Sequence, residues 1–92
     1  MNGEIVGRVV ISNAGHDKGE FYAIVSVLDD KHVAVTNGLS RKINAPKKKN
    51  LRHLRITNSH VPEFAKLITA EQVSANLKLA DVLKREANGG RR

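Results

Sequence analysis

The apolar residues change their spacing near residue 59, and this change limits the possible folds more than any other feature of the chain. Before it, they occur in short β-branched or alternating runs separated by turns and polar loops, a pattern typical of strands. We expect strands at residues 4–12, 21–28, 32–35, 39–43 and 51–56. Five short strands joined by tight connections predict a mostly β fold, a small antiparallel barrel or strongly bent sheet.

The expected turns support this division. Gly7 interrupts the first run and predicts a bulge or a close approach of another segment to the backbone. Asn37-Gly38 predicts a type I′ hairpin, because both residues tolerate positive φ. Residues 45–50, Ala-Pro-Lys-Lys-Lys-Asn, predict an exposed loop or edge, since proline lacks a ladder donor and lysines favour solvent.

Beyond residue 59 the spacing becomes helical. Residues 62–68 predict a short helical turn with Pro62 at its first position. Thr69 and Gln72 match a capping box, with Thr69 as the N-cap of a longer helix. One face of that helix carries Val73, Leu77, Ala80 and Leu83.

The two spacings predict two parts. The first is a barrel over residues 1–57, and the second is a C-terminal helical extension with a basic tail over residues 58–92. We expect the apolar helix face to pack on the barrel as part of the core. The alternative is that this face binds a partner.

Composition argues against catalysis. The chain has no cysteine, which excludes disulfides, thiolate metal sites and a cysteine nucleophile. Only three residues are aromatic, which is little material for a substrate cavity. No serine lies in a G-x-S-x-G context, and the histidines lie in separate segments without metal-ligand spacing: His16, His32, His53 and His60. We expect no enzyme activity, no cofactor and no metal site.

The chain carries no membrane or secretion signal that its sequence would reveal. No apolar run approaches the roughly 18 residues of a transmembrane helix. The N-terminus lacks a basic flank followed by an apolar segment. We therefore expect an intracellular, cytoplasmic protein without a membrane partner.

Positive charge is concentrated in one segment. Sixteen Lys and Arg against nine Asp and Glu give a net charge of +7. Residues 41–55 contain seven cations and no carboxylate, so the rest of the chain is neutral overall. Such a segment repels itself, and the phosphates of a nucleic acid would relieve that repulsion. The alternative is a solvated loop without a partner.

One stretch of the chain resembles a known RNA-binding element. Residues 6–19, VGRVVISNAGHDKG, followed by an apolar strand, look like a KOW motif, which occurs in ribosomal proteins and transcription elongation factors. The likeness continues at residues 27–30, 37–38, 41–42, 46–49 and 51–54. Over residues 4–57 the chain resembles the eukaryotic-type L-fourteen family of large-subunit ribosomal proteins, in its short bacterial form.

The resemblance implies an SH3-like (KOW) barrel that binds RNA of the translation machinery and has no enzymatic activity. The RNA would be ribosomal RNA of the large subunit, and ribosomal proteins would be further partners. His16 stands where the family pattern favours arginine. The candidate RNA-binding residues are Arg8, Gly15, His16, Lys18, Gly19, Arg41, Lys42, Lys47, Lys48, Lys49, Arg52, His53 and Arg55.

Several alternatives stay open at this point. The glycines at 15 and 19 either serve their turn or let the backbone approach a phosphate. Electrostatics alone does not distinguish RNA from DNA. The runner-up function is a KOW module that binds proteins, or acts as a transcription or translation factor, without stable ribosome association. We expect a monomer when free, and we expect replacement of Lys47, Lys48 and Lys49 to lower RNA affinity with the fold intact.

Overall fold

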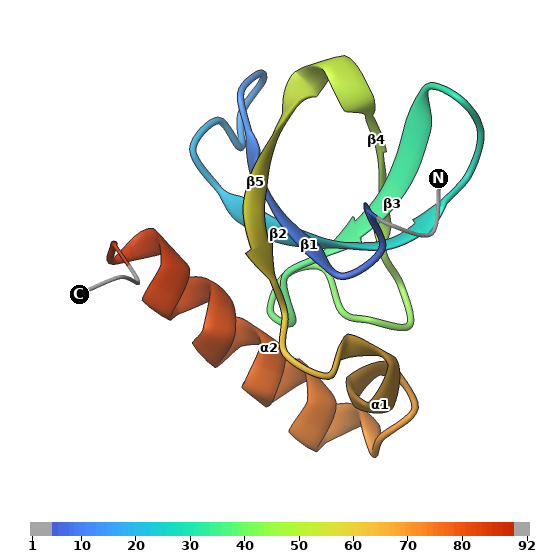
Figure 1. Cartoon of the computed structure of the whole chain (residues 1–92), viewed down its shortest axis with the longest axis vertical. Helices are drawn as coiled ribbons and strands as arrows, with labels where there is room; N and C mark the ends of the chain where they lie inside the picture. Colours follow the sequence, from blue (N-terminus) through green and yellow to red (C-terminus); the bar gives the residue numbers. More distant parts are fainter. Residues whose placement is uncertain (1–4, 90–92) are drawn as a thin grey trace.

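The computed structural model describes residues 5–89 and contains one five-stranded antiparallel sheet and two helices (Figure 1). The order of strands in the sheet is β4-β3-β2-β1-β5. The sheet curls strongly, so that β4 and β5 stand opposite each other and the short 3-10 helix η2 joins them (Figure 1). The elements are β1 (Arg8–Ser12), β2 (Phe21–Val27), β3 (His32–Thr36), β4 (Lys47–Asn50), η2 (Leu51–His53), β5 (Leu54–His60), α1 (Phe64–Ile68) and α2 (Gln72–Ala87). The expected mostly β barrel with a C-terminal helical segment is confirmed.

The central strands bury side chains on both faces of the sheet. Val9 and its neighbour Val10 are both fully buried, but they belong to different core clusters. Because neighbouring strand residues point to opposite faces, one cluster fills the inside of the curled sheet and the other lies under the helices. The inner cluster contains Val10, Tyr22, Ile24, Val33, Val35 and Leu54. The outer cluster joins Val9 and Ala23 to Phe64, Leu67, Ala75, Leu79 and Leu83.

Strand limits differ from the expected ones at the first and last strands. β1 begins at Arg8 because Val6 and Gly7 form a turn, and a side chain at Gly7 would lie 3.0 Å from the Phe64 side chain. The close approach expected at Gly7 is therefore present. η2 occupies the start of the fifth expected strand, and β5 continues to His60, where it pairs with Arg8. The expected boundary at residue 57 thus falls inside β5.

The expected hairpin at Asn37-Gly38 and its returning strand at 39–43 are wrong. Among the described residues only Glu63 and several glycines have positive φ, so Asn37 does not adopt the type I′ conformation. Its side chain instead accepts hydrogen bonds from the backbone N–H groups of Leu39 and Arg41. This bend turns residues 38–45 away from the sheet, and the lysine triplet in β4 supplies the edge strand that pairs with β3.

The loop after the bend rests on helix α2. Gly38 has φ +78°, and a Cβ there would lie 2.2 Å from the carbonyl oxygen of Asn76. The buried Asn76 side chain accepts a hydrogen bond of 2.9 Å from the backbone N–H of Ile43. Only glycine permits this contact, because any side chain would push the loop off the helix.

The helix start and the helix face also differ from the expectation. Thr69 is the C-cap of α1, and α2 is capped by Glu71, whose carboxylate accepts hydrogen bonds from the N–H groups of Val73 and Ser74. Pro62 lies in a turn before α1 rather than at its first position. Of the expected face, Leu83 is buried and Ala80 half-buried, whereas Val73 and Leu77 are exposed. The small residues Ala75 and Asn76 take the inward position, where the backbone of residue 38 approaches most closely.

Within residues 5–89, neither helix has the length and apolar character that crossing a bilayer requires.

Candidate nucleic-acid interface

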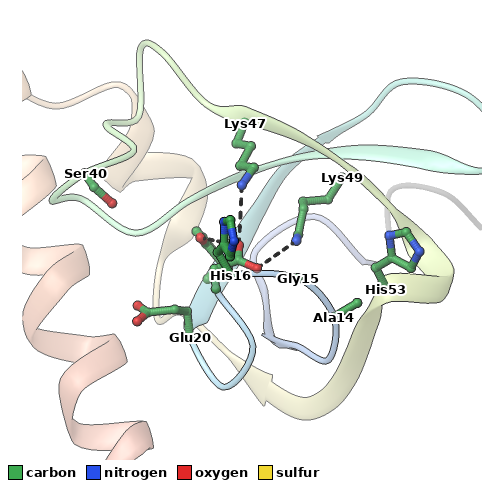
Figure 2. A pocket seen from close by; sticks show the side chains of 10 residues that line it. Ala14, Gly15, His16, Glu20, Ser40, Lys47, Lys49 and His53 are labelled. Atoms are coloured by element: carbon green, nitrogen blue, oxygen red, sulfur yellow. Dashed lines mark hydrogen bonds and ion pairs between the residues drawn. The ribbon is translucent and has the colours of Figure 1, made fainter.

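A concavity of about 490 Å³ opens between the loop at 13–20, β4 and η2 (Figure 2). It brings together five of the sequence-predicted residues, from three segments of the chain: Gly15, His16, Lys47, Lys49 and His53. The remaining lining residues are Ala14, Asp17, Glu20, Tyr22 and Ser40. The glycine-containing loop and the basic segment, which are far apart in sequence, therefore share one hollow on the surface.

The loop at 13–20 is held in place by its own backbone and by η2. The N–H of Gly19 bonds to the carbonyl of Ser12 at 2.8 Å, and the N–H of Ser12 bonds to the carbonyl of Glu20 at 2.9 Å. The N–H of Asn13 donates to the carbonyl of His53 at 2.9 Å, which joins the loop to η2. The loop is thus fixed against the segment that carries the basic residues.

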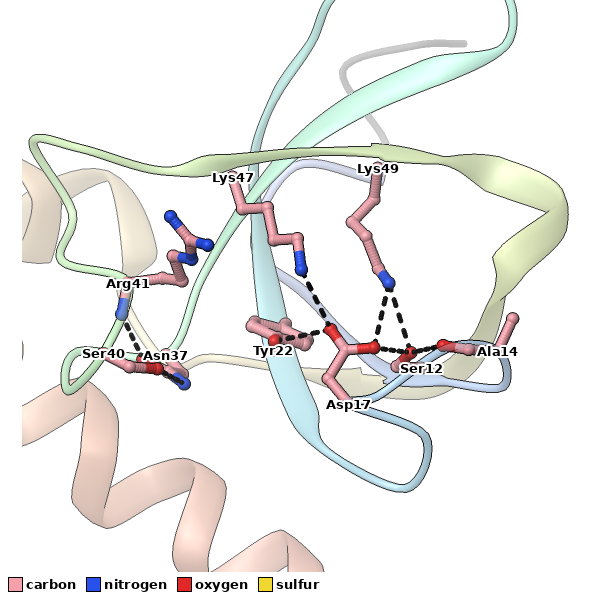
Figure 3. A network of polar contacts seen from close by, with 9 residues as sticks. All are labelled: Ser12, Ala14, Asp17, Tyr22, Asn37, Ser40, Arg41, Lys47 and Lys49. Carbon is pink, nitrogen blue, oxygen red and sulfur yellow. Dashed lines mark hydrogen bonds and ion pairs between the residues drawn. The ribbon is translucent and has the colours of Figure 1, made fainter.

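Asp17 is the centre of a polar network beneath the concavity (Figure 3). Its Oδ1 accepts a hydrogen bond from Ser12 Oγ at 2.7 Å and lies 3.1 Å from Lys49 Nζ. Its Oδ2 accepts a hydrogen bond from Tyr22 OH at 2.8 Å and lies 3.6 Å from Lys47 Nζ. Lys47 and Lys49 reach the same carboxylate because alternate residues of a strand share a face.

The network shifts the pKa values of both its acidic groups. Burial of the Asp17 carboxyl raises its pKa, but the hydrogen bonds from Ser12, Tyr22 and Lys49 and the charge of Lys49 outweigh that effect, so the pKa lies well below its usual range. Burial and the neighbouring Asp17 carboxylate raise the pKa of Tyr22 far above its usual value. Asp17 is therefore an anion and Tyr22 a hydrogen-bond donor at neutral pH.

The expectation that the lysine triplet favours solvent is wrong for Lys49. Lys49 is only 9% exposed, because its ammonium turns inward and pairs with the Asp17 carboxylate. We therefore expect replacement of all three lysines to destabilise the fold, because Asp17 would lose its counter-charges. Lys48 is exposed on the opposite face of β4, and Lys47 is half-buried.

Three exposed cations follow the curved segment that runs from β4 through η2 into β5. We call them the basic arch: Lys48, Arg52 and Arg55. Within residues 5–89, none of the three forms an ion pair with a carboxylate. Asn50 shapes the arch, since its side chain accepts a hydrogen bond of 3.0 Å from the N–H of Arg52 at the start of η2.

The other candidate cations lie around the concavity or away from it. Lys18 is exposed on the loop. The positive charge of Arg41 acts on Tyr22 and offsets a small part of the rise in the pKa of the phenol. Lys42 turns its ammonium to the carbonyl of Leu39, on the side of the molecule near α2. Arg8 lies on β1 and donates to the carbonyl of Thr57 at 3.0 Å, outside the concavity.

The site has two features that sequence reasoning missed. Asp17 was not recognised as the partner of Lys49, and Glu20 places a carboxylate among the lining residues. Of the predicted loop or edge at residues 45–50, the edge alternative is present as β4, and the alternation along that strand places Lys47 and Lys49 on one face with a shared partner. Across residues 5–89, no three His, Asp or Glu side chains gather closely enough to hold a metal ion.

Fold and surface together define a small curled β-barrel protein with a helical extension and exposed cations along β4, η2 and β5. The chain is 33% identical over 78 residues to the large ribosomal subunit protein eL14 of Methanococcus maripaludis, an alignment that covers 85% of this chain and 94% of that protein. It is 32% identical, with the same coverage, to the large ribosomal subunit protein eL14 of Methanococcus vannielii. The chain therefore belongs to the eL14 family. No protein-family model matches it.

Proposed function

We propose that this protein is an RNA-binding component of the large ribosomal subunit, which it joins by holding ribosomal RNA. One observation carries the proposal: relatives named as large-subunit proteins align over 94% of their length with this chain. The exposed cations that form no ion pair within residues 5–89 agree with it. In this proposal the free protein is a cytoplasmic monomer, it has no catalytic role, and neighbouring ribosomal proteins are its further partners.

The basic arch provides the main contact with RNA. Lys48, Arg52 and Arg55 are exposed and unpaired in the described part of the chain, so each is free to neutralise a phosphate. The concavity, on the other face of β4 from Lys48, adds donors from Lys47, His16 and His53. The loop backbone at Gly15 lies open at its rim and admits a phosphate oxygen at close range.

Recognition rests on the shape and backbone of the RNA. Within residues 5–89 the Phe and Tyr rings are at least half-buried: Tyr22 and Phe64 are buried, and Phe21 is partly covered. Without an exposed Phe or Tyr ring, the surface offers bases only histidine rings and arginine planes on which to stack. Phosphate contacts then supply the affinity, and the fold of the RNA supplies the selectivity.

The buried lysine changes the expected salt dependence. All seven cations of residues 41–55 would give a log–log salt slope of about −5 to −6. Lys49 is already neutralised by Asp17, which leaves six cations and a slope of about −4 to −5 at most. A measured slope in this range would support backbone contact by the exposed cations.

Sedimentation through a sucrose gradient tests the ribosomal role. Tagged protein in a cell lysate is expected to migrate with the large subunit at moderate salt and to leave it at high salt. Protein found only at the top of the gradient would reject a stable ribosomal component. It would favour instead a KOW module that acts on a transient RNA or a protein partner.

A matched pair of variants tests the arch. The arch variant is Lys48→Gln with Arg52→Gln and Arg55→Gln, and the control removes three exposed lysines from the helical part, Lys66→Gln with Lys78→Gln and Lys84→Gln. Both variants lose the same charge. We expect the arch variant to lower the magnitude of the salt slope for large-subunit RNA by about 2 to 3, and the control to change it by less than about 1. Equal effects would mean that net charge, rather than the arch, governs binding.

A further inference from the structure

The most exposed of the large apolar side chains gather in one groove on the helical side of the molecule. In the described part of the chain, five large hydrophobic residues are exposed, and three of them line this groove: Leu39, Val73 and Leu77, with 61%, 64% and 62% of their surface exposed. The groove measures about 340 Å³ and lies between residues 38–44 and the first turns of α2. An apolar cluster of this kind on a small protein marks an interaction surface.

Specific contacts of the fold hold the two sides of the groove in place. Val73 and Leu77 are one helical turn apart and share the outward face of α2, opposite the buried Leu79 and Leu83. Leu39 is brought beside them because the backbone of Gly38 lies against Asn76. The side-chain oxygen of Asn37 accepts a hydrogen bond of 2.9 Å from the N–H of Leu39 and holds this residue in place. A surface held in this way loses little conformational entropy when a partner binds.

Charge around the groove limits what can occupy it. Lys42 is the one charged residue that lines it among the described residues, and Arg41 begins the basic segment next to it. A second copy of this chain would bring the same cations face to face, and each copy carries +7. RNA gains little from three aliphatic side chains without an aromatic ring. An apolar surface with a cationic rim fits instead a protein segment with aliphatic and acidic residues.

We propose that this groove binds an acidic amphipathic helix of another protein. Its aliphatic side chains, one turn apart, would pack between Leu39 and the ridge formed by Val73 and Leu77, and a carboxylate beside them would pair with Lys42. This interface lies on the helical side of the chain, whereas the basic arch lies on β4, η2 and β5. The protein would therefore join an RNA on one surface to a protein on another.

The test uses the full chain and a designed peptide. The probe is a helix-forming peptide of Leu, Ala and Glu, with leucines at i, i+3, i+4 and i+7 and a negative net charge. A scrambled peptide of the same composition controls for unspecific attraction to a basic protein. In an NMR titration of the labelled protein, the ordered peptide is expected to shift the amide signals of Leu39, Val73 and Leu77 saturably, and the scrambled peptide is expected not to.

Two surface variants locate the binding energy. Val73→Ser with Leu77→Ser is expected to weaken peptide binding at least about tenfold. Leu28→Ser, at a leucine of the β2–β3 turn that is 50% exposed, is expected to leave it unchanged. Lys42→Glu is expected to reverse the preference between this peptide and one in which Lys replaces every Glu. All three apolar positions are exposed, so we expect the variants to fold. The dispersion of their own NMR spectra shows whether they do.

Three results would overturn the proposal. The first is no saturable shift at the groove up to about 1 mM peptide. The second is shifts confined to the basic arch, with equal affinity for the scrambled peptide. The third is a concentration-dependent dimer in sedimentation analysis that Leu77→Ser abolishes, which would make a second copy of this chain the occupant.

Discussion

Lys49 and Asp17 form an ion pair of 3.1 Å that joins the edge strand β4 to the loop between β1 and β2. Their side chains are only 10% and 16% exposed, and Ser12 and Tyr22 donate to the same carboxylate. One lysine of the basic segment thus holds the loop and the edge strand together through a largely buried ion pair. The charge pattern alone makes all seven cations of that segment look equivalent, whereas the fold assigns them different roles.

The ion pair leads to a prediction for stability. Asp17→Asn keeps the size of the side chain but leaves the buried ammonium of Lys49 without its counter-charge. Breaking a buried pair by removing one partner costs about 3 to 5 kcal/mol. We expect a loss toward the lower end of this range in the free energy of unfolding, measured by urea denaturation, because neither side chain is completely buried.

The double variant tests whether the loss arises from the unpaired charge. Lys49→Met in the Asp17→Asn background removes the ammonium that has no partner and fills the space with an apolar chain. We expect the double variant to regain part of the stability lost in Asp17→Asn. If the double variant is less stable than both single variants, the pair is not the reason for the loss.

Tyr22 allows a direct spectroscopic test of the same network. It is the only tyrosine of the chain, so the absorbance of phenolate reports this residue alone. Burial and Asp17 raise its pKa in the folded protein, and the proton is therefore held more tightly in the folded state than in the unfolded one. The stability that this contributes is complete below the ordinary pKa of about 10 and is lost as pH rises toward the folded value.

We expect the phenolate of Tyr22 to appear only well above pH 10 in the native protein. The same titration in concentrated urea should return to the ordinary value, and Asp17→Asn should move the native titration toward it. A native tyrosine that titrates at its ordinary value would contradict the hydrogen bond between Tyr22 and Asp17.

The sequence predicted those parts of the fold that depend on short-range patterns. The strand at 21–28 was predicted because its apolar run fills both the inner and the outer core, and the strand at 32–35 because Val33 and Val35 alternate toward the inner core. The hairpin predicted at Asn37-Gly38 was wrong, because the Asn37 side chain closes a wider bend and Asn76, far along the chain, accepts a hydrogen bond from the backbone N–H of Ile43. Helix α2 was predicted, but its N-cap was placed at Thr69 instead of Glu71, and the predicted buried face was rotated because the spacing of apolar residues fitted two faces.

The candidate site was predictable only in part for the same reason. The concavity brings together His16 and His53 as well as the lysines, which agrees with a grouping based on motif and charge. The pairing of Asp17 with Lys49 spans 32 positions and follows from strand register, which the prediction of an exposed loop or edge at residues 45–50 does not reveal. Which cations remain free is therefore a property of the fold.

The helical part is expected to be necessary for the barrel to fold. Residues 1–57 end inside β5 and lack His60, which pairs with Arg8 at the start of β1. They also leave Val9 and Ala23 without Phe64, Leu79 and the rest of the outer core. We expect this fragment to give the circular dichroism and amide spectra of an unfolded chain, and addition of a peptide covering residues 58–89 to restore native signals. A fragment that folds alone would show that the inner core suffices.

Alanine substitutions at two glycines distinguish the cost in stability of a positive φ from the cost of a close contact. Gly19 has φ +92° with no atom within 4 Å of a Cβ, whereas Gly38 has φ +78° and a Cβ there would meet the Asn76 carbonyl at 2.2 Å. Gly19→Ala is therefore expected to lose about 1 to 2 kcal/mol from conformation alone. Gly38→Ala should lose at least about 3 kcal/mol, because the overpacked loop must also leave α2.

The two alanine variants should also differ in their spectra. Gly38→Ala is expected to shift the amide signal of Ile43, since the loop can no longer keep its hydrogen bond to Asn76. Gly19→Ala is expected to leave that signal in place and to affect only the loop at 13–20. Equal losses of stability, or an unmoved Ile43 signal in Gly38→Ala, would mean that the loop and helix α2 are not held together by this contact. The link matters for function because the same loop carries Arg41 and Lys42 at the start of the basic segment, and Leu39 in the apolar groove.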